Sequence, residues 1–195
     1  MKSLILASHS PRRQDLLKEA GFNFLAVKSE FVEDFDENGD PHEVACAMAK
    51  GKALDVYNFF ENLGEDMSHV VILAADTIVY NEGKILGKPK NKLHAREMLK
   101  SLTGKFHSVY TGFCILTKNK EFIHANETKV KIAKMGPNAI IQYVKEFNPV
   151  DKAGGYGIQD SFYLIDRIVG SYSNVVGLPI EYIKPILEKF LNEEE

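Results

Sequence analysis

The segment LILASHSPRRQDLLKEAG, residues 4–21, has the pattern of a short apolar strand, a tight turn and a helix. Ser10 suits the N-cap of that helix, and Gly21 suits its end. Two adjacent arginines, Arg12 and Arg13, stand in the first turn, where the partly positive helix end disfavours cations. A strand that leads directly into a helix is typical of a layered α/β sheet. The segment therefore indicates the fold class and leaves the two arginines to be explained.

An anion held at this helix start would explain them. Backbone N–H groups and the helix dipole favour phosphate there, and the hydroxyl groups of Ser8 and Ser10 add donors. Guanidinium groups bind phosphate oxygens in pairs, so Arg12 and Arg13 fit a phosphate site. The alternative is that both arginines are ordinary exposed side chains. The site is not a Walker loop, because the sequence lacks the GxxxxGK pattern.

Strand and helix patterns alternate along the rest of the chain. Apolar periodicity and cap residues predict strands at 22–27, 70–79, 106–117, 121–134 and 162–169, and helices at 41–61, 92–102, 137–147 and from residue 179. Pro185 should kink or split the last helix. The stretches NEG (81–83) and KNK (118–120) indicate hairpins, which interrupt the alternation. We therefore expect an α/β protein with a mixed sheet and not a pure series of βαβ units.

The size and charge of the chain narrow the class of protein. Its 195 residues, 45% of them hydrophobic, suit one compact domain or two closely packed lobes. The net charge of −3 argues against a dedicated partner of nucleic acid polymers. Cys46 and Cys114 show no metal-ligand spacing, so neither structural zinc nor a disulfide framework is indicated. No apolar run reaches the length of a membrane span or signal peptide, so we expect a cytoplasmic protein without a membrane partner.

Three residues are candidates for chemistry. Asp76 in the motif AADT follows an apolar run and should emerge from the end of a buried strand. Its carboxylate suits holding a divalent cation or taking a proton from water, although capping a turn is the commoner role. Lys52 falls on the apolar stripe of its helix and should face inward, where it would snorkel or meet an anion. Lys88 lies in a Gly–Pro loop after the strand of Asp76, and solvated charge is the ordinary alternative for both lysines.

Other polar residues complete the set of candidates. We expect the acidic segment 29–40 to be mostly surface charge, with one or two metal ligands beside Asp76. Spacing does not choose among Glu30, Glu33, Asp34, Asp36 and Glu37. Gln159 follows a glycine-rich stretch, and its amide both donates and accepts, which suits reading the edge of a nucleobase. His107 lies in a strand pattern without ligand spacing and is expected to be structural.

Six motifs occur in order: SHSPRRQDLL, AADT, GKP, LTGKFHSVYTG, DKAGGYGIQ and GSYSNVVGLP. With them the chain resembles the Maf family of nucleoside triphosphate pyrophosphatases, once described as septum-formation inhibitors, from Leu4 to about Leu187. The resemblance implies one domain over residues 1–195. It also implies an elongated α/β fold whose two lobes flank a deep cleft, similar to inosine triphosphatases.

The same resemblance implies a reaction and its residues. Hydrolysis between the α- and β-phosphates would give a nucleoside monophosphate and pyrophosphate, with Mg²⁺, Mn²⁺ or Co²⁺ as the cation. Asp76 matches the proton acceptor, and Lys52 and Lys88 match catalytic positions in the same cleft. The phosphate-binding residues of the family match Ser8, Ser10, Arg12 and Arg13. Its metal ligands match Glu33 and Asp76. A homodimer is compatible with the family.

Two branches of the family differ in substrate. Arg12, Thr77 and Gln159 match the branch that acts on dTTP, UTP and modified pyrimidine nucleotides, whereas the other branch prefers 7-methyl-GTP. Two positions depart from the pattern: Asp160 replaces a glycine and adds a charge beside Gln159, and Asn91 replaces an aspartate. An alternative function is a nucleotide-binding regulator that inhibits septum formation through protein partners. A third is a phosphatase that releases orthophosphate.

Overall fold

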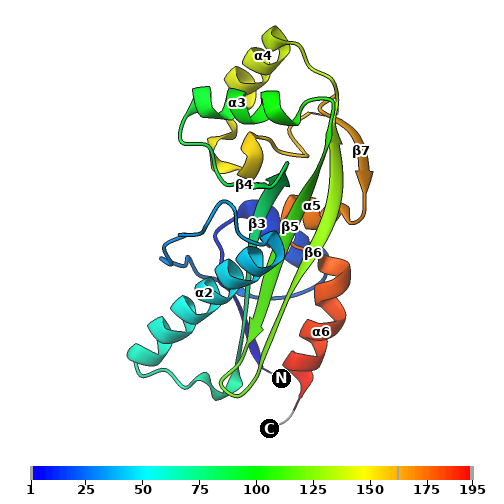
Figure 1. Cartoon of the computed structure of the whole chain (residues 1–195). Coiled ribbons are helices and arrows are strands. Elements are labelled where there is room, and N and C mark those ends of the chain that lie inside the picture. Colours follow the sequence, from blue (N-terminus) through cyan, green and yellow to red (C-terminus); the bar gives the residue numbers. More distant parts are fainter. Residues whose placement is uncertain (1, 162, 194–195) are drawn as a thin grey trace.

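The computed structural model describes residues 2–161 and 163–193, and these form one mixed sheet with helices around it (Figure 1). The sheet has the strand order β2-β1-β3-β5-β6-β7, and β4 pairs with the end of β3. The strands are β1 (Ser3–Leu6), β2 (Leu25–Ala26), β3 (Val70–Asn81), β4 (Lys84–Leu86), β5 (Phe106–Leu116), β6 (Glu121–Ile132) and β7 (Ile165–Val169). The pairs β1–β2 and β1–β3 are parallel and the others are antiparallel, which confirms the predicted mixed α/β sheet.

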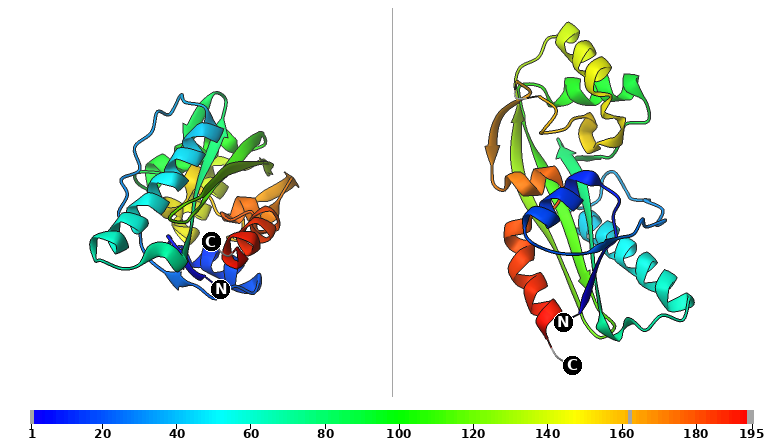
Figure 2. Two further views of the ribbon diagram at one scale, coloured as in Figure 1. Left: turned by 90° about the horizontal axis from the view of Figure 1, so that it is seen from below. Right: turned by 180° about the vertical axis from the view of Figure 1, so that it is seen from behind.

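Helices cover the sheet in an elongated arrangement. They are α1 (Pro11–Glu19), α2 (Pro41–Asn62), α3 (Lys92–Leu102), α4 (Pro137–Phe147), α5 (Tyr172–Val176) and α6 (Ile180–Asn192), with short 3₁₀ turns η1 (Met67–His69), η2 (Pro149–Asp151) and η3 (Ala153–Gly155). The strands β5 and β6 follow the long axis, with α3 and α4 at one end (Figure 1). Toward the other end α2 covers one face of the sheet, and α1 and α6 cover the opposite face (Figure 2).

The alternation of side chains along β3 divides the core between these two faces. Leu73 and Ala75 pack in a cluster with residues of α1 and α6, whereas Ile72 and Ala74 pack with residues of α2. Successive side chains of a strand point to opposite faces. Asp76 therefore belongs to the α2 face and Thr77 to the α1 face, which separates two neighbouring polar residues.

The helix α2 lies unusually close to the sheet at Gly112 of β5. A Cβ atom added there would lie 2.1 Å from the carbonyl oxygen of Ala45, so only glycine leaves room for the helix backbone. Gly112 is the cross-strand partner of Asp76. One and two turns after Ala45, the same stripe carries Ala49 and Lys52, and Lys52 is buried as predicted. The close approach thus brings the ammonium group of Lys52 to Asp76.

Local capping signals define several element boundaries. The Asp40 side chain accepts a hydrogen bond of 2.9 Å from the backbone N–H of Glu43 at the start of α2. Asn91 caps α3 in the same way through the N–H of His94, also at 2.9 Å. These contacts confirm the predicted helix starts, because a short polar side chain at the N-cap satisfies a free amide.

Most predicted ends agree with the structure to within two residues, and three predictions differ in other ways. The strand predicted at 22–27 is only Leu25–Ala26, an edge strand that pairs with β1 and leaves Leu25 exposed. The last helix runs through Pro185 without splitting. One missing hydrogen bond is tolerated there because Ile183 and Leu187 on either side are fully buried. The strand predicted at 162–169 is found at Ile165–Val169, and position 162 lies outside the described residues.

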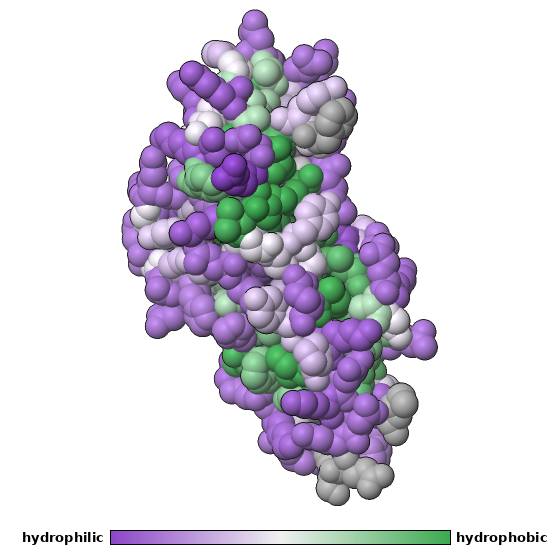
Figure 3. Space-filling model, turned by 90° about the vertical axis from the view of Figure 1, so that its right-hand side faces the viewer, coloured by the Kyte–Doolittle hydropathy of each residue, from purple (hydrophilic) through white to green (hydrophobic). Residues whose placement is uncertain are grey.

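One side of the molecule, the right-hand side in Figure 1, is shown in Figure 3. Hydrophilic residues cover most of this face, and apolar residues form separate patches in its upper, middle and lower parts. In the part of the chain that the structure describes, every helix is too short or too polar to cross a membrane.

Candidate active site

A cleft opens along β3, between the end of β1 and the start of β4. Pairing with β1 reaches Leu73 and pairing with β4 begins at Val79, so the intervening edge of β3 faces the cleft. Its volume is about 490 Å³, a size ordinary for small-molecule sites. It is lined by the turn 7–13, parts of the acidic segment, Lys52, residues 76–79 of β3, Lys88, and the loop 151–160. All the site residues predicted from the sequence therefore line one cleft.

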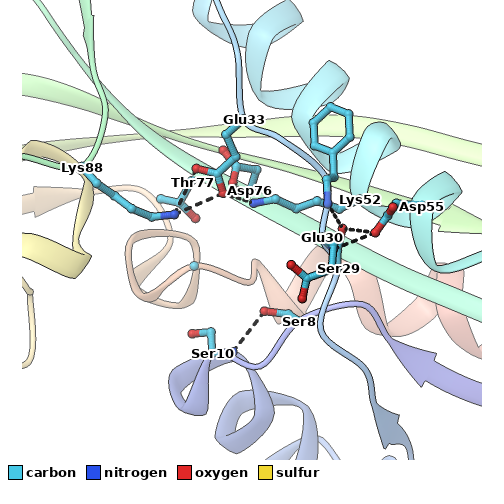
Figure 4. A network of polar contacts seen from close by, with 12 residues as sticks. Ser8, Ser10, Ser29, Glu30, Glu33, Lys52, Asp55, Asp76, Thr77 and Lys88 are labelled. Carbon is cyan, nitrogen blue, oxygen red and sulfur yellow. Dashed lines mark hydrogen bonds and ion pairs between the residues drawn. The ribbon is translucent and has the colours of Figure 1, made fainter. Parts of the chain in front are cut away.

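Two carboxylates and two lysines form what we call the carboxylate–lysine cluster: Glu33, Lys52, Asp76 and Lys88 (Figure 4). The Nζ atom of Lys52 donates to Glu33 Oε1 at 2.7 Å and forms a close ion pair with Asp76 Oδ1. The Nζ atom of Lys88 lies 3.0 Å from Glu33 Oε2. Lys52 and Asp76 are buried, so their opposite charges compensate each other in a region poor in water.

The two lysines determine the charge state of Glu33. Partial burial opposes its ionisation, but hydrogen bonds and charge from Lys52 and then Lys88 outweigh burial and lower its pKa to about 2. Glu33 is therefore a carboxylate throughout the physiological range.

The acidic segment is fastened to α2, which aims Glu33 into the cleft. Asp55 of α2 accepts hydrogen bonds of 2.8 Å from the Ser29 hydroxyl and from the backbone N–H of Glu30. The ring of Phe31 packs directly against Gly51 of the same helix. Glu33 follows these two anchors, and this long-range fastening selects it from the acidic residues that sequence spacing left equivalent.

The start of α1 forms the opposite wall of the cleft. Ser10 is at the N-cap position, but its hydroxyl makes no capping hydrogen bond to the described residues. The Ser8 hydroxyl accepts a hydrogen bond of 3.2 Å from the backbone N–H of Ser10. The free amides of the first helical turn and the Ser10 hydroxyl are thus available to an anion in the cleft.

The two arginines of this helix have different surroundings. Arg13 is partly buried: its Nε donates to the carbonyl of Gly177 at 2.8 Å, and its two terminal nitrogens donate to Thr77 at 3.2 Å and Ser8 at 3.4 Å. Burial lowers its pKa, and the charge of Asp76 partly opposes that effect. Arg12 lies across the cleft from the loop 151–160, with Nη1 3.5 Å from Asp151 Oδ2. Contacts within the protein thus explain how two cations are tolerated at a helix start. Arg13 is held by three hydrogen bonds and Arg12 by one ion pair, so Arg12 is the arginine that can more easily turn to a ligand.

Thr77 is held in a hydrogen-bond network on the α1 face of the sheet. Its hydroxyl lies 2.9 Å from the hydroxyl of Thr111, which donates to the carbonyl of Asn174 in α5 at 2.7 Å. Gln159 is exposed and lines the cleft on the other side, in the loop 151–160. The structure therefore gives Thr77 a role in joining β3, β5 and α5, and leaves Gln159 as an exposed residue of the cleft lining.

The Maf-like protein family matches residues 3–190 of this sequence. The chain belongs to that family. Two relatives called dTTP/UTP pyrophosphatase are similar to this Maf-like protein: one from Caldicellulosiruptor bescii, 42% identical over 97% of this chain and 95% of the relative, and one from Pyrococcus furiosus, 44% identical over 96% and 95%. A solved structure of the Staphylococcus aureus Ham1 protein aligns with a TM-score of 0.48 and 16% identity, over 97% of this chain and 100% of that chain.

Two cleft residues of this Maf-like protein, and one residue behind its loop 151–160, were not singled out from the sequence. Asp151 and Lys152 precede the glycine-rich stretch, and Tyr143 reaches the loop from α4. The adjacent opposite charges of Asp151 and Lys152, next to a flexible segment in a family motif, were the available signal. The carboxylate of Asp160, which adds the expected charge beside Gln159, accepts a hydrogen bond of 2.6 Å from Tyr143.

His107 lies beneath the cleft and is structural, as predicted. It is 4% exposed, its Nε2 shares a 2.6 Å hydrogen bond with the hydroxyl of Tyr156, and its Nδ1 has no partner among the described residues. Burial lowers its pKa to about 4. The native protein therefore keeps this ring neutral at pH values where an unfolded chain would protonate it.

This difference predicts a stability change between about pH 6.5 and pH 4. The unfolded state binds the extra proton in that window, so stability is present above it and is lost as the pH falls, by up to about 3 kcal/mol. Urea denaturation at several pH values measures this loss, and His107→Gln should remove this part of the slope. His69→Gln, at an exposed histidine, should keep the wild-type slope. Equal slopes for wild type and His107→Gln would contradict the assignment.

Proposed function

We propose that this Maf-like protein is a nucleoside triphosphate pyrophosphatase that hydrolyses dTTP and UTP to the monophosphate and pyrophosphate. The observation that carries the reaction class is the carboxylate–lysine cluster facing the start of α1 across one cleft. A buried carboxylate opposite free helix amides suits attack of water on a bound phosphate. The relatives named dTTP/UTP pyrophosphatase support the choice of substrate.

In the proposed reaction the triphosphate lies along the first turn of α1. The amides of that turn, Ser8, Ser10 and Arg12 would bind phosphate oxygens, and Lys52 and Lys88 would offset their charge. Asp76 takes a proton from water while the water oxygen bonds to the α-phosphorus. The bond from the α-phosphorus to the bridging oxygen breaks, and pyrophosphate leaves with that oxygen.

The cleft also fits a divalent cation bound together with substrate. Among residues 2–161 and 163–193 no group of three metal-ligating side chains comes together. Glu33 and Asp76 nevertheless provide two carboxylates, which suits Mg²⁺ because it is commonly held by one or two carboxylates plus substrate phosphates and water. Such a cation would supply charge stabilisation to the phosphate oxygens. Mn²⁺ and Co²⁺ are the alternatives within this proposal.

The proposal extends to the organisation of the chain. Residues 1–195 would form a single domain with two lobes, because β5 and β6 run along both and could not be divided between two folding units.

We assign the protein to the cytoplasm, where nucleoside triphosphates are made and used. Its partner would be the nucleotide substrate and not a nucleic acid polymer or membrane.

Product analysis with purified protein, Mg²⁺ and a panel of nucleoside triphosphates tests the function. Monophosphate and pyrophosphate from dTTP and UTP are the expected products. Orthophosphate as the first product would instead indicate a phosphatase. Tight nucleotide binding without turnover of any triphosphate would favour a regulator that inhibits septum formation through protein partners.

Replacing Gln159 tests how the base is read. Gln159→Ala should reduce the preference for UTP over CTP by about tenfold, because a side chain that hydrogen-bonds the base edge rejects a base with the wrong donors. Binding of inorganic tripolyphosphate, which has no base, should stay unchanged. Gln142→Ala, at an exposed glutamine of α4, is the matched control. Equal weakening for all nucleotides and for tripolyphosphate would refute the role.

A further inference from the structure

The turn that carries Gln159 is closed by a single tyrosine hydroxyl from another element. Tyr143 of α4 accepts a hydrogen bond of 3.0 Å from the backbone N–H of Gly157 and donates one of 2.6 Å to Asp160 Oδ2. The backbone N–H of Asp160 in turn donates to the carbonyl of Gly157 at 3.1 Å. Gln159 thus lies between two residues that are both tied to the same hydroxyl group.

The residue that anchors this turn is buried. Tyr143 is 5% exposed and belongs to the apolar core between α3, α4 and the end of β6. Burial and the hydrogen bond to Asp160 raise its pKa, so the phenol remains protonated and remains a donor. Two hydrogen bonds from a buried ring therefore fix a turn that otherwise borders the solvent.

The carboxylate of Asp160 folds back over the turn. A Cβ atom at Gly157 would lie 2.5 Å from Asp160 Oδ1, so the carboxylate occupies the space next to that glycine. Lys152 approaches from the other side, with Nζ 3.7 Å from Asp160 Oδ2 and 3.0 Å from Asp151 Oδ1. The side chains of Lys152 and Asp160 are 13% and 14% exposed. The negative charge beside Gln159 is thus compensated by Lys152 and oriented by Tyr143.

We propose that Asp160 is a positioning residue which, held by Tyr143 and Lys152, fixes the turn carrying Gln159 and so sets selectivity for the nucleobase. The inference rests on the proposed function, because it assumes that Gln159 meets the base. The Asp160 carboxylate already accepts from the Tyr143 hydroxyl and pairs with the Lys152 ammonium group. It is therefore not free to accept a hydrogen bond from the amino group of a base, and it gives no advantage to bases that carry one. The carboxylate acts through the backbone of the turn and does not touch the reacting phosphates.

Binding of the non-hydrolysable α,β-imido analogues of UTP and CTP, and of inorganic tripolyphosphate, tests the proposal with the full-length protein and Mg²⁺. Tyr143→Phe and Asp160→Ala should each raise the Kd of the UTP analogue about tenfold and lower its advantage over the CTP analogue by a similar factor. The Kd of tripolyphosphate should change less than about twofold, because the phosphate side is untouched. In turnover assays KM for UTP should rise with little change in kcat.

Two further variants make the readout specific. Asp160→Asn keeps an oxygen that can accept from Tyr143, so it should restore most of the UTP selectivity lost in Asp160→Ala. Tyr182→Phe, at a half-exposed tyrosine of α6, removes a hydroxyl outside the cleft and should leave all affinities unchanged. If Tyr143→Phe fails to fold, the two Asp160 variants still decide the question, because Asp160 lies in a loop.

The outcomes separate this proposal from the proposed function. Unchanged selectivity in Asp160→Ala, or equal weakening of the UTP analogue and tripolyphosphate, would overturn the positioning role. Wild-type protein that releases no pyrophosphate from any nucleotide would contradict the enzymatic function alone. The Kd values of the UTP and CTP analogues would then still test whether Asp160 positions the turn. Loss of UTP selectivity with intact tripolyphosphate binding supports the proposal in either case.

Discussion

Replacing Asp76 with asparagine should lower the rate of pyrophosphate release from UTP by about 10³-fold, the contribution expected of a positioned general base. The amide has nearly the same shape but cannot take a proton from water. It also leaves Lys52 without its buried partner, since Lys52 contacts only Glu33 and Asp76 as ion-pair partners among the described residues. Steady-state turnover at saturating nucleotide measures the loss.

Nucleotide binding separates a chemical defect from a folding defect in this variant. The α,β-imido analogue of UTP should still bind to Asp76→Asn, because α1 and the loop 151–160 are unchanged. Asp66→Asn is a matched control: Asp66 caps η1 away from the cleft and an asparagine caps equally well, so turnover should remain at the wild-type level. Near-wild-type turnover in Asp76→Asn would remove Asp76 from the role of proton acceptor.

Replacing Gly112 with alanine should have the largest effect on stability, a loss of about 3 kcal/mol or more in the free energy of unfolding. The added methyl group would lie 2.1 Å from the carbonyl oxygen and 2.3 Å from the carbonyl carbon of Ala45. These are backbone atoms of α2, so no side-chain rotation relieves the overlap and the helix must move away from the sheet.

Urea denaturation measures this loss, and activity reports the movement of α2. Lys52 lies on the displaced helix, so Gly112→Ala should also reduce turnover even under conditions where it remains folded. Gly136→Ala is the control, because a Cβ atom there meets nothing within 4 Å and the backbone needs no positive φ. It should lower the free energy of unfolding by no more than about 1 kcal/mol, the cost of replacing glycine by alanine at the N-cap of α4. A Gly112→Ala variant as stable as this control would show that the helix can adjust without cost.

Local features of the fold follow from short-range chemistry and were predicted from the sequence. The caps at Asp40 and Asn91, the hairpin before β4 and the helix at 137–147 depend on residues within a few positions of one another. The inward direction of Lys52 depends only on helical periodicity. The strand at 22–27 was predicted too long, because the length of an edge strand depends on its partner. The last helix is not split at Pro185, because its buried neighbours hold it together.

The sequence by itself determined the fold class, the helix that begins beside two arginines, and, through six ordered motifs, the family. Tertiary structure alone decided how Glu33 and Asp76 are joined through Lys52, which groups hydrogen-bond Arg13, and where the Asp160 carboxylate lies. Arg13 binds the carbonyl of Gly177, 164 positions away, and no local periodicity encodes that contact. Such pairs are set by the close approach of α2 to the sheet and by the packing of loops against buried helices. These are properties of the assembled chain, because they depend on which surfaces meet once the core has formed.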